Sequence, residues 1–225
     1  MPQPHLDPAV LQALKRYDTP TMSNAIETFD IRPRDTGFAS QDVRCLFPEL
    51  GVMVGYAATA VIRARGQGTG DPAPLWEHVR AVPAPRVVVV QDLDDPPAHG
   101  AMWGEVMANT FSALACAGVV TDGSVRDLDE VRALGFHFFA RSTGVSHAYV
   151  RVEEVGHPVT VGGLTISPND LIHADQHGVL LIPGEIAAEL PAAADRVIAA
   201  EQEYIGWLRS PDFDPAQIAA HRPRH

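Results

Sequence analysis

The chain of 225 residues is 46% hydrophobic and 20% charged, a composition typical of a globular protein with one substantial core. Its formal net charge is −11 and its basic residues do not cluster, so we expect no nucleic-acid and no membrane partner, and small-molecule ligands are favoured. Cys45 and Cys116 have neither disulfide-framework nor zinc-site spacing, and no signal peptide or membrane span is predicted. We therefore expect a cytoplasmic protein.

The N-terminal part of the chain predicts two short helices and a strand. Apolar residues recur at helical spacing over residues 7–17 behind an Asp-Pro pair, and a second helix is predicted over 21–29. Residues 31–51 are irregular, whereas residues 56–63 are rich in the β-branched and small residues of a strand. The glycine-rich residues 66–70 lack the Gly-Lys-Ser/Thr ending of a phosphate-binding loop, so we interpret them as a flexible loop.

The middle of the chain alternates strands and helices. Four consecutive valines at 87–90 predict a strand that is buried on both faces of a parallel sheet. A helix over 103–117, a strand over 118–121, a helix over 125–134 and a strand over 136–140 follow. This βαβαβ order predicts a parallel core with right-handed crossovers.

The second half of the chain indicates mixed or antiparallel strands. Residues 145–152 alternate in polarity, residues 159–166 form a hairpin around two glycines, and residues 178–182 form another buried strand. A long helix rich in Ala and Glu is predicted over 184–209, and the tail 210–225 is expected to be loosely held. Without an internal repeat or a linker, the chain is interpreted as a single layered α/β domain.

Charged residues follow two strands of the predicted parallel core. The first strand leads to the segment Gly104-Glu105-Val106-Met107, and the next leads to Arg126-Asp127, with Glu130 one helical turn beyond Arg126. Ligands of open parallel sheets bind beyond the carboxyl ends of the strands, where helix N-termini present free N–H groups. If the two strands are neighbours, these residues converge on one pocket.

The residue types in this pocket support two interpretations. Three carboxylates without a thiolate suit a hard divalent ion such as Mg²⁺ or Mn²⁺, and an adjacent arginine suits a carboxylate substrate. Acidic residues in the first turn of a helix also occur because they complement the helix dipole. Glu105, Asp127 and Glu130 would then be solvated acids, and Arg126 would form a surface pair with Asp127.

The spacing of these residues also resembles a known family. Glu105, twenty further residues, Arg126-Asp127, two residues and Glu130 follow the acid-x20-Arg-Asp-x2-acid pattern of the RraA-like proteins that act as class II 4-hydroxy-4-methyl-2-oxoglutarate / 4-carboxy-4-hydroxy-2-oxoadipate aldolases. Glu105 stands where better-studied members have Asp, and His137 and Asn169 depart from the usual Pro and Gly. Further segments that resemble the family are residues 118–123, 135–136, 139–141, 158–163 and 175–179.

The resemblance implies a layered β/β/α fold and an enzyme that cleaves a 4-hydroxy-2-oxo acid to pyruvate and a second oxo acid, with oxaloacetate decarboxylation as a side activity. It implies that Asp127 holds the divalent metal directly and that Glu105 and Glu130 contact it through water. Arg126 would bind substrate oxygens near the breaking bond, and the Gly104–Met107 segment would bind the pyruvyl carboxylate through the N–H groups of Val106 and Met107. A water molecule oriented by a carboxylate would be the base.

The resemblance also implies a homotrimer or a dimer of trimers, in which an acid of a neighbouring subunit, with Glu201 as the candidate, completes the site. A Schiff-base mechanism is disfavoured because the only lysine, Lys15, belongs to the first predicted helix and no feature of the sequence places it in a pocket.

Two other functions are alternatives to the aldolase. One is a non-catalytic regulator that binds a protein partner such as ribonuclease E, and the other is a methyltransferase, for which no suitable glycine-rich loop is present.

Overall fold

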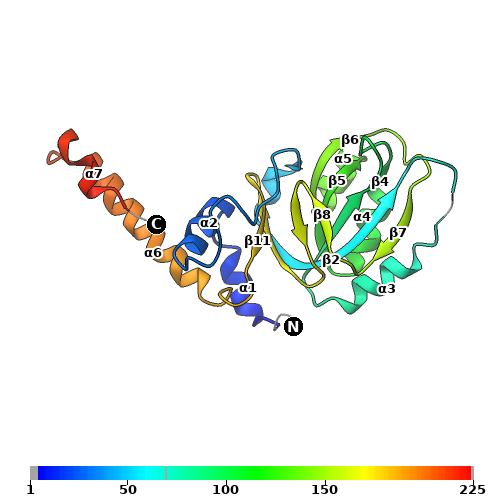
Figure 1. Ribbon diagram of the computed structural model, residues 1–225, viewed down its shortest axis with the longest axis horizontal. Helices are drawn as coiled ribbons and strands as arrows, with labels where there is room; N and C mark the ends of the chain where they lie inside the picture. Colours follow the sequence, from blue (N-terminus) through cyan, green and yellow to red (C-terminus); the bar gives the residue numbers. More distant parts are fainter. Residues whose placement is uncertain (1–4, 69, 224–225) are drawn as a thin grey trace.

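In the computed structural model, which describes residues 5–68 and 70–223, the chain folds around one large mixed sheet (Figure 1). Thr69 of the predicted glycine-rich loop and the last two residues of the predicted tail lie outside the described residues. The helices are α1 (Pro8–Leu14), α2 (Thr19–Glu27), α3 (Ala73–Ala81), α4 (Glu105–Ala113), α5 (Leu128–Leu134), α6 (Leu190–Leu208) and α7 (Ile218–His221), with the 3-10 helices η1 (Pro48–Leu50) and η2 (Pro215–Gln217). The strands are β1 (Arg44–Cys45), β2 (Met53–Arg63), β3 (Arg86–Asp92), β4 (Ala101–Trp103), β5 (Cys116–Val125), β6 (His137–Thr143), β7 (Arg151–Val155), β8 (Val159–Val161), β9 (Leu164–Ile166), β10 (Leu171–Asp175) and β11 (Gly178–Ile182).

The large sheet has the strand order β1-β6-β5-β3-β2-β10-β11, with β4 paired to β5 and β7 paired to β2. Neighbouring strands from β2 to β6 are parallel, because α3, α4 and α5 return the chain to the same edge of the sheet. The strands β1, β7, β10 and β11 add to this core in antiparallel pairs. The predicted parallel core with a mixed second half is therefore confirmed.

The two faces of the sheet are covered by different layers. Val88 and Val90 of β3 face a core that includes residues of α1 to α6. Val87 and Val89 face a second core, which is closed by the hairpin of β8 and β9. Because successive residues of a strand point to opposite faces, the run of valines fills both cores at once. These layers confirm the expected β/β/α arrangement.

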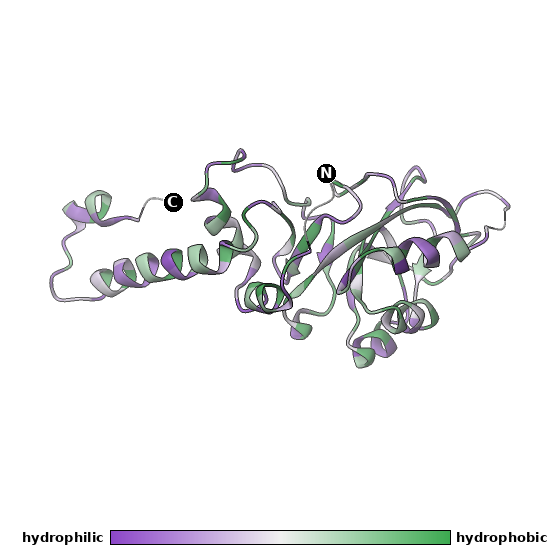
Figure 2. Cartoon of the chain, turned by 90° about the horizontal axis from the view of Figure 1, so that it is seen from below, coloured by the Kyte–Doolittle hydropathy of each residue, from purple (hydrophilic) through white to green (hydrophobic). Residues whose placement is uncertain are grey.

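The C-terminal helix α6 projects away from the sheet, and α7 folds back beside it (Figures 1 and 2). The first half of α6 packs against α2, and the buried residues of α6 are Leu190, Ala193, Ala194 and Val197. In the predicted tail, the ring of His221 stacks on Trp207 with 4.1 Å between ring centroids, and Phe213 meets the same indole at 5.3 Å. No helix of the described residues is long and apolar enough to cross a membrane.

Several predicted boundaries are wrong by a few residues. The helix predicted over 103–117 is shorter, because Trp103 ends β4 and the chain enters β5 at Cys116. The strand predicted over 118–121 extends to Val125, since Ser124 and Val125 pair with both β4 and β6. As a result α5 begins at Leu128 rather than at 125.

Other differences arise from contacts between distant segments. The strand predicted over 56–63 begins at Met53 because β10 pairs with its first residues. Strand β7 covers Arg151–Val155, later than the predicted 145–152, and α6 begins at Leu190 rather than at 184. Helix α3 and the strands β4 and β10 were not predicted, since short apolar stretches carry little periodic signal.

Candidate active site

The candidate site lies where β4 leads into α4 and β5 leads into α5. Strands β4 and β5 are parallel neighbours, and the backbone N–H of Arg126 donates to the Trp103 carbonyl at 2.8 Å. This bond joins the residues before the two helices, so the N-termini of α4 and α5 start side by side. The predicted convergence of Glu105 with Arg126-Asp127 follows from this pairing.

Asp127 connects the two helix N-termini. Its Oδ2 atom accepts a hydrogen bond from the Glu105 backbone N–H at 3.0 Å and lies 3.8 Å from Arg126 Nε. Asp127 is in the left-handed region, with φ 56° and ψ 49°, a conformation that Asp and Asn adopt more readily than most residues. This backbone turns the carboxylate back toward α4, away from the usual capping contact with its own helix.

The space beside Gly104, at the start of α4, is filled by the side chains of Asp127 and Arg126. A Cβ atom there would overlap with Asp127 Oδ2 and lie 3.0 Å from Arg126 Cγ. The backbone at Gly104 is extended, so the requirement is steric and does not come from an unusual φ. The absence of a side chain lets Asp127 reach the Glu105 N–H.

The N-terminus of α4 leaves donors available beside the carboxylate. Among the described residues, the backbone N–H groups of Val106 and Met107 have no hydrogen-bond partner, as expected for the first turn of a helix. The side chains of Arg126 and Asp127 are each 37% exposed. A small anionic ligand can therefore reach both the helix N-terminus and the guanidinium.

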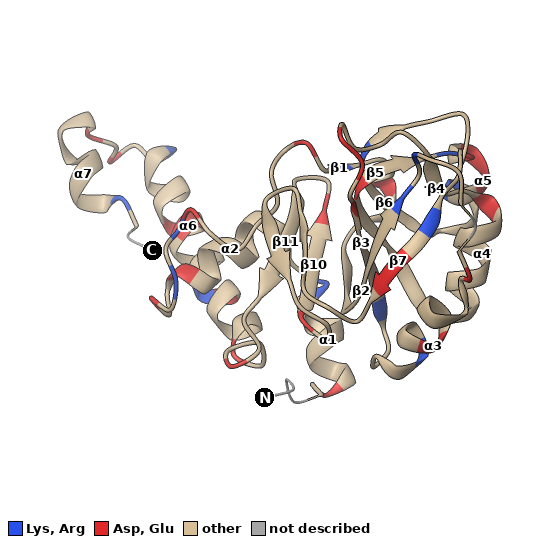
Figure 3. Ribbon diagram, turned by 45° about the vertical axis from the view of Figure 1, so that its right-hand side comes forward, with Lys and Arg blue, Asp and Glu red and all other residues tan. Residues whose placement is uncertain are grey.

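The acids predicted to assist Asp127 are not in contact with it through their side chains. Glu105 and Glu130 are exposed, and in the described part of the chain neither carboxylate contacts Arg126 or Asp127. Glu201 lies on α6, at the opposite end of the molecule from α4 and α5 (Figures 1 and 3). Its carboxylate accepts a hydrogen bond from the Asn24 side chain at 3.3 Å. Glu201 could reach a site of this kind only in another copy of the chain.

The donors beside Asp127 decide which kind of metal ion the site could hold. Within residues 5–68 and 70–223, no group of three or more His, Cys, Asp or Glu side chains is arranged to hold a metal ion. Asp127 makes both of its contacts through Oδ2, which leaves Oδ1 without a protein partner in this part of the chain. Mg²⁺ commonly binds through one or two carboxylates and keeps several water ligands, so the donor set fits a weakly anchored hard cation.

Arg126 lines two pockets. One, of about 370 Å³, also includes Asp127, Thr143 and Val145. The other, of about 280 Å³, also includes Met107 from α4, His147 from the loop after β6 and Arg151 from β7. A further pocket of about 290 Å³, between α2 and β11, contains none of the predicted site residues.

His147 and Arg151 were missed as site residues. They come from the second half of the chain. The pairing of β7 with β2 brings Arg151 to the pocket beside Arg126, and His147 lies in the loop after β6, where the Ser146 carbonyl accepts the Ala101 N–H at 2.9 Å. Figure 3 shows basic and acidic segments together on β7, in the same part of the molecule as α4 and α5. The sequence signal was limited to an arginine within a stretch of alternating polarity.

A group of buried and half-buried carboxylates braces the ends of β3 and β5. Asp122 Oδ1 accepts the Asp92 N–H at 2.8 Å, and Asp92 in turn accepts the N–H groups of Asp94 and Ala98 at 2.9 Å and 2.7 Å. Burial raises the pKa of Asp122 to about 6 and also raises the pKa of Asp92. These acids order the loops that lead to the site.

Comparison with curated proteins finds partial matches. A protein of Halalkalibacterium halodurans named "Putative 4-hydroxy-4-methyl-2-oxoglutarate aldolase" is 34% identical over 84 residues, which are 37% of this chain and 40% of that protein. Protein DlpA of Legionella pneumophila is 28% identical over 117 residues, which are 50% of this chain and 18% of that protein. The chain thus covers less than half of the length of these two relatives.

Comparison with solved structures and with family models covers more of the chain. A crystal structure of an uncharacterized protein from Pseudomonas syringae pv. tomato has a TM-score of 0.76 at 23% identity and covers 99% of this chain and 98% of that one. Streptomyces coelicolor RraAS2, described as an unusual member of the RNase ES inhibitor RraA protein family, has a TM-score of 0.70 at 24% identity and covers 92% of this chain and 100% of that one. Residues 19–181, which contain the whole candidate site, match the model of the RraA-like family described as Aldolase/RraA, and the chain therefore belongs to the RraA-like family.

Proposed function

We propose that the protein is a divalent-metal-dependent class II aldolase, a carbon–carbon lyase for 4-hydroxy-2-oxo acids of the 4-hydroxy-4-methyl-2-oxoglutarate type. The products would be pyruvate and a second oxo acid, and oxaloacetate would be decarboxylated through the same enolate. The observation that carries the proposal is the position of Asp127, which lies against the N-terminus of α4 and beside Arg126. Its relatives that are named as aldolases of this type support the substrate class.

Different residues of the site would bind different parts of the substrate. The free N–H groups of Val106 and Met107, at the positive end of α4, would bind the pyruvyl carboxylate. Arg126 would donate to the oxygens near the breaking bond, where negative charge develops. Glu105 or Glu130, which are exposed in the first turns of α4 and α5, would orient the water that accepts a proton.

Asp127 would hold the divalent ion, Mg²⁺ or Mn²⁺, through the Oδ1 atom that has no protein partner among the described residues. When bound, such an ion supplies Lewis acidity to the 2-oxo group and its carboxylate. The carboxylate of Asp127 cannot swing freely, because the Glu105 N–H and the close approach of Gly104 fix it. The chain would thereby set the position of the ion relative to Arg126.

The proposed cleavage balances without an oxidant or reductant. The 4-hydroxyl group loses its proton to the water oriented by a carboxylate, and C4 becomes a carbonyl carbon as the C3–C4 bond breaks. The electron pair of that bond passes to C3 and is delocalised onto the 2-oxo oxygen as the pyruvate enolate. Arg126 would stabilise the negative charge during this step, and protonation of C3 gives pyruvate.

The experiment is an assay of pyruvate release from a panel of 4-hydroxy-2-oxo acids and from oxaloacetate, with Mg²⁺, with Mn²⁺ and with EDTA. We expect turnover only with the added ion. Borohydride in the presence of pyruvate should leave the enzyme active, because the only lysine, Lys15, lies at the end of α1, on another part of the fold from α4 and α5 (Figure 1). Covalent inactivation by borohydride would contradict the proposed mechanism.

A non-catalytic regulator that binds a protein such as ribonuclease E is the competing function, and the description of RraAS2 names a protein family of that kind. RraAS2 and this chain share 24% sequence identity, so the similarity shows a common fold and nothing about function. If the folded protein releases no pyruvate from any compound of the panel, the result would favour the regulatory function.

A further inference from the structure

The 280 Å³ pocket beside Arg126 is lined by positively charged residues, although the chain as a whole has a negative net charge. Its ionisable lining residues are Arg126, His147 and Arg151, and no Asp or Glu is among the described residues that line it. Met102, Met107 and Val150 supply apolar walls. In a chain with a net charge of −11, a pocket whose charged lining residues are two arginines, with no acid among the described lining residues, favours a ligand with more than one negative charge.

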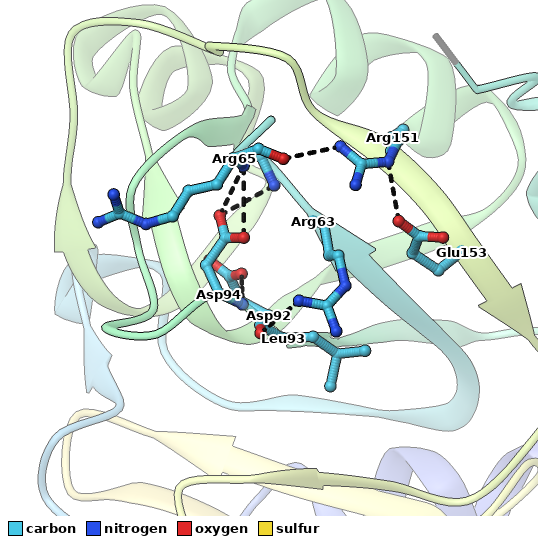
Figure 4. Close-up of polar contacts among 8 residues, drawn as sticks. Arg63, Arg65, Asp92, Leu93, Asp94, Arg151 and Glu153 are labelled. Atoms are coloured by element: carbon cyan, nitrogen blue, oxygen red, sulfur yellow. Dashed lines mark hydrogen bonds and ion pairs between the residues drawn. The ribbon is translucent and has the colours of Figure 1, made fainter. Parts of the chain in front are cut away.

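Arg151 is held in a fixed orientation at this pocket (Figure 4). Its Nε lies 2.8 Å from Glu153 Oε1, and its Nη1 donates to the Arg65 carbonyl at 2.9 Å. Only 21% of the side chain is exposed. The Nη2 group has no partner among the described residues, so part of the forked donor is available to a ligand.

The segment that holds Arg151 is itself anchored to the end of β3. The Arg65 N–H donates to the buried carboxylate of Asp94 at 3.0 Å, and the Asp94 N–H donates to Asp92 Oδ1 at 2.9 Å (Figure 4). Asp92 accepts one further N–H group, that of Ala98, at 2.7 Å. Arg151 is therefore fixed relative to β3, which pairs with β5, the strand that leads to Arg126. Little side-chain entropy is then lost when Arg151 binds a ligand.

We propose that Arg151 binds a second carboxylate of the substrate and that the pocket selects 2-oxo acids with two carboxylates. This inference rests on the proposed function, in which Arg126 and the N-terminus of α4 bind the reacting end of the molecule. Arg151 lines the same pocket from β7 and offers a planar, permanently charged group suited to a carboxylate. Glu153 is 34% exposed and contacts Nε, so it orients the guanidinium and leaves Nη2 for the substrate.

The test uses two probes of equal chain length that cannot undergo the aldol cleavage, 2-oxoglutarate and 2-oxopentanoate, which differ in the second carboxylate. Their binding to the full chain is measured by calorimetry with Mg²⁺ present. In Arg151→Gln we expect the affinity for 2-oxoglutarate to fall about 10- to 100-fold, the usual effect of losing a charge-assisted hydrogen bond. The affinity for 2-oxopentanoate should change by less than about 2-fold, because it lacks the group that Arg151 would bind.

Arg63→Gln is the matched control. Arg63 pairs with Arg151 across β2 and β7 and also donates to a backbone carbonyl, that of Leu93 at 3.0 Å, but it does not line the pocket (Figure 4). We expect this variant to bind both probes as the unsubstituted protein does. Arg151→Lys, which keeps the charge and loses the fork, should bind 2-oxoglutarate with intermediate affinity and serves if Arg151→Gln fails to fold.

The outcomes separate this inference from the proposed function. Equal loss of affinity for both probes in Arg151→Gln, the same loss in Arg63→Gln, or no binding of 2-oxoglutarate by the unsubstituted protein would overturn the role of Arg151. Pyruvate release from 4-hydroxy-2-oxo acids would then still support the aldolase. Conversely, a preference for 2-oxoglutarate that depends on Arg151 in a protein that releases no pyruvate would support the binding role and contradict the aldolase.

Discussion

The carboxylate of Asp127 occupies the space that a side chain at Gly104 would need, although the two residues precede different helices. The contact joins the end of β4 to the end of β5 and directs Asp127 Oδ2 to the Glu105 N–H at 3.0 Å. The position of the proposed metal ligand therefore depends on a glycine that takes no direct part in the chemistry.

Gly104→Ala should disturb the site more than the fold. The new methyl group must displace Asp127 or the start of α4, and overpacking of this kind costs about 1–3 kcal/mol. A displaced carboxylate should lower kcat/KM by about 100-fold. Steady-state kinetics and urea unfolding measure both effects. Gly206→Ala, in α6 with open space around it, is the control and should leave activity unchanged.

Asp127→Asn should lose metal binding while the chain stays folded. Asn tolerates the left-handed backbone at this position and can still accept the Glu105 hydrogen bond, so it is a cleaner substitution than Ala. Removing the anionic ligand should weaken Mn²⁺ binding by about two orders of magnitude or more. Calorimetry or Mn²⁺ resonance gives the affinity, with exposed Asp129→Asn as the control. Unchanged metal affinity would show that Asp127 is not the ligand.

Arg126→Lys should fail in a different way from Asp127→Asn. Lysine keeps the positive charge but loses the planar fork, so the metal should still bind while the charge that develops on the substrate is poorly stabilised. We expect kcat to fall by about two to three orders of magnitude. Arg132→Lys on α5, where Arg132 pairs with Glu49 and Asp129, is the control. A normal kcat in Arg126→Lys would remove Arg126 from the proposed mechanism.

His137 should make the protein less stable in mild acid. Burial, with a smaller contribution from Lys15, lowers the pKa of His137 to about 4, and its Nδ1 has no hydrogen-bond partner. Between the unfolded pKa of about 6.5 and about 4, the unfolded chain binds a proton that the native chain does not, so stability falls as the pH falls.

The pH dependence can be separated from that of other groups by a single substitution. His137→Leu removes the titrating group, so its free energy of unfolding relative to the unsubstituted protein should rise by about 2 kcal/mol between pH 7.5 and pH 5. The contribution of Asp122 is present in both proteins and cancels. Urea unfolding at several pH values measures the difference. A pH-independent difference for His137→Leu would contradict the assignment.

We expect the protein to form a trimer or a pair of trimers. Four apolar residues at loosely helical spacing, Ile186, Leu190, Val197 and Ile198, would be expected from the sequence to offer apolar surface to a partner. That expectation is wrong for the first three, which are buried within the chain, and only Ile198 is exposed. Val106 and Val145, however, are 76% and 97% exposed beside the candidate site, and α6 projects from the fold (Figure 2). Light scattering at micromolar concentration should give three or six times the 24.2 kDa chain mass, and a monomer would refute the expectation.

The sequence by itself determined the architecture and the location of the candidate site. A run of valines between helical stretches specifies a parallel strand buried on both faces, and the handedness of crossovers leaves few ways to arrange such strands. Glu105 belongs to the segment after β3, and Arg126-Asp127 follows β5, the parallel neighbour of β3. Because parallel neighbours end at the same edge of a sheet, the convergence of these residues could be predicted, and the pairing of β4 with β5 brings it about. The roles assigned to these residues stay predictions.

Only the tertiary structure decided how the site is built. The extension of β5 to Val125 depends on its pairing with β4 and β6, and this extension places Asp127 in the left-handed turn that directs it toward α4. Arg151 reaches the pocket because β7 pairs with β2, although the two strands are far apart along the chain. Local periodicity reports which face of an element is apolar, whereas contacts between distant segments depend on how the elements pack, and this information is not present in any short stretch of sequence.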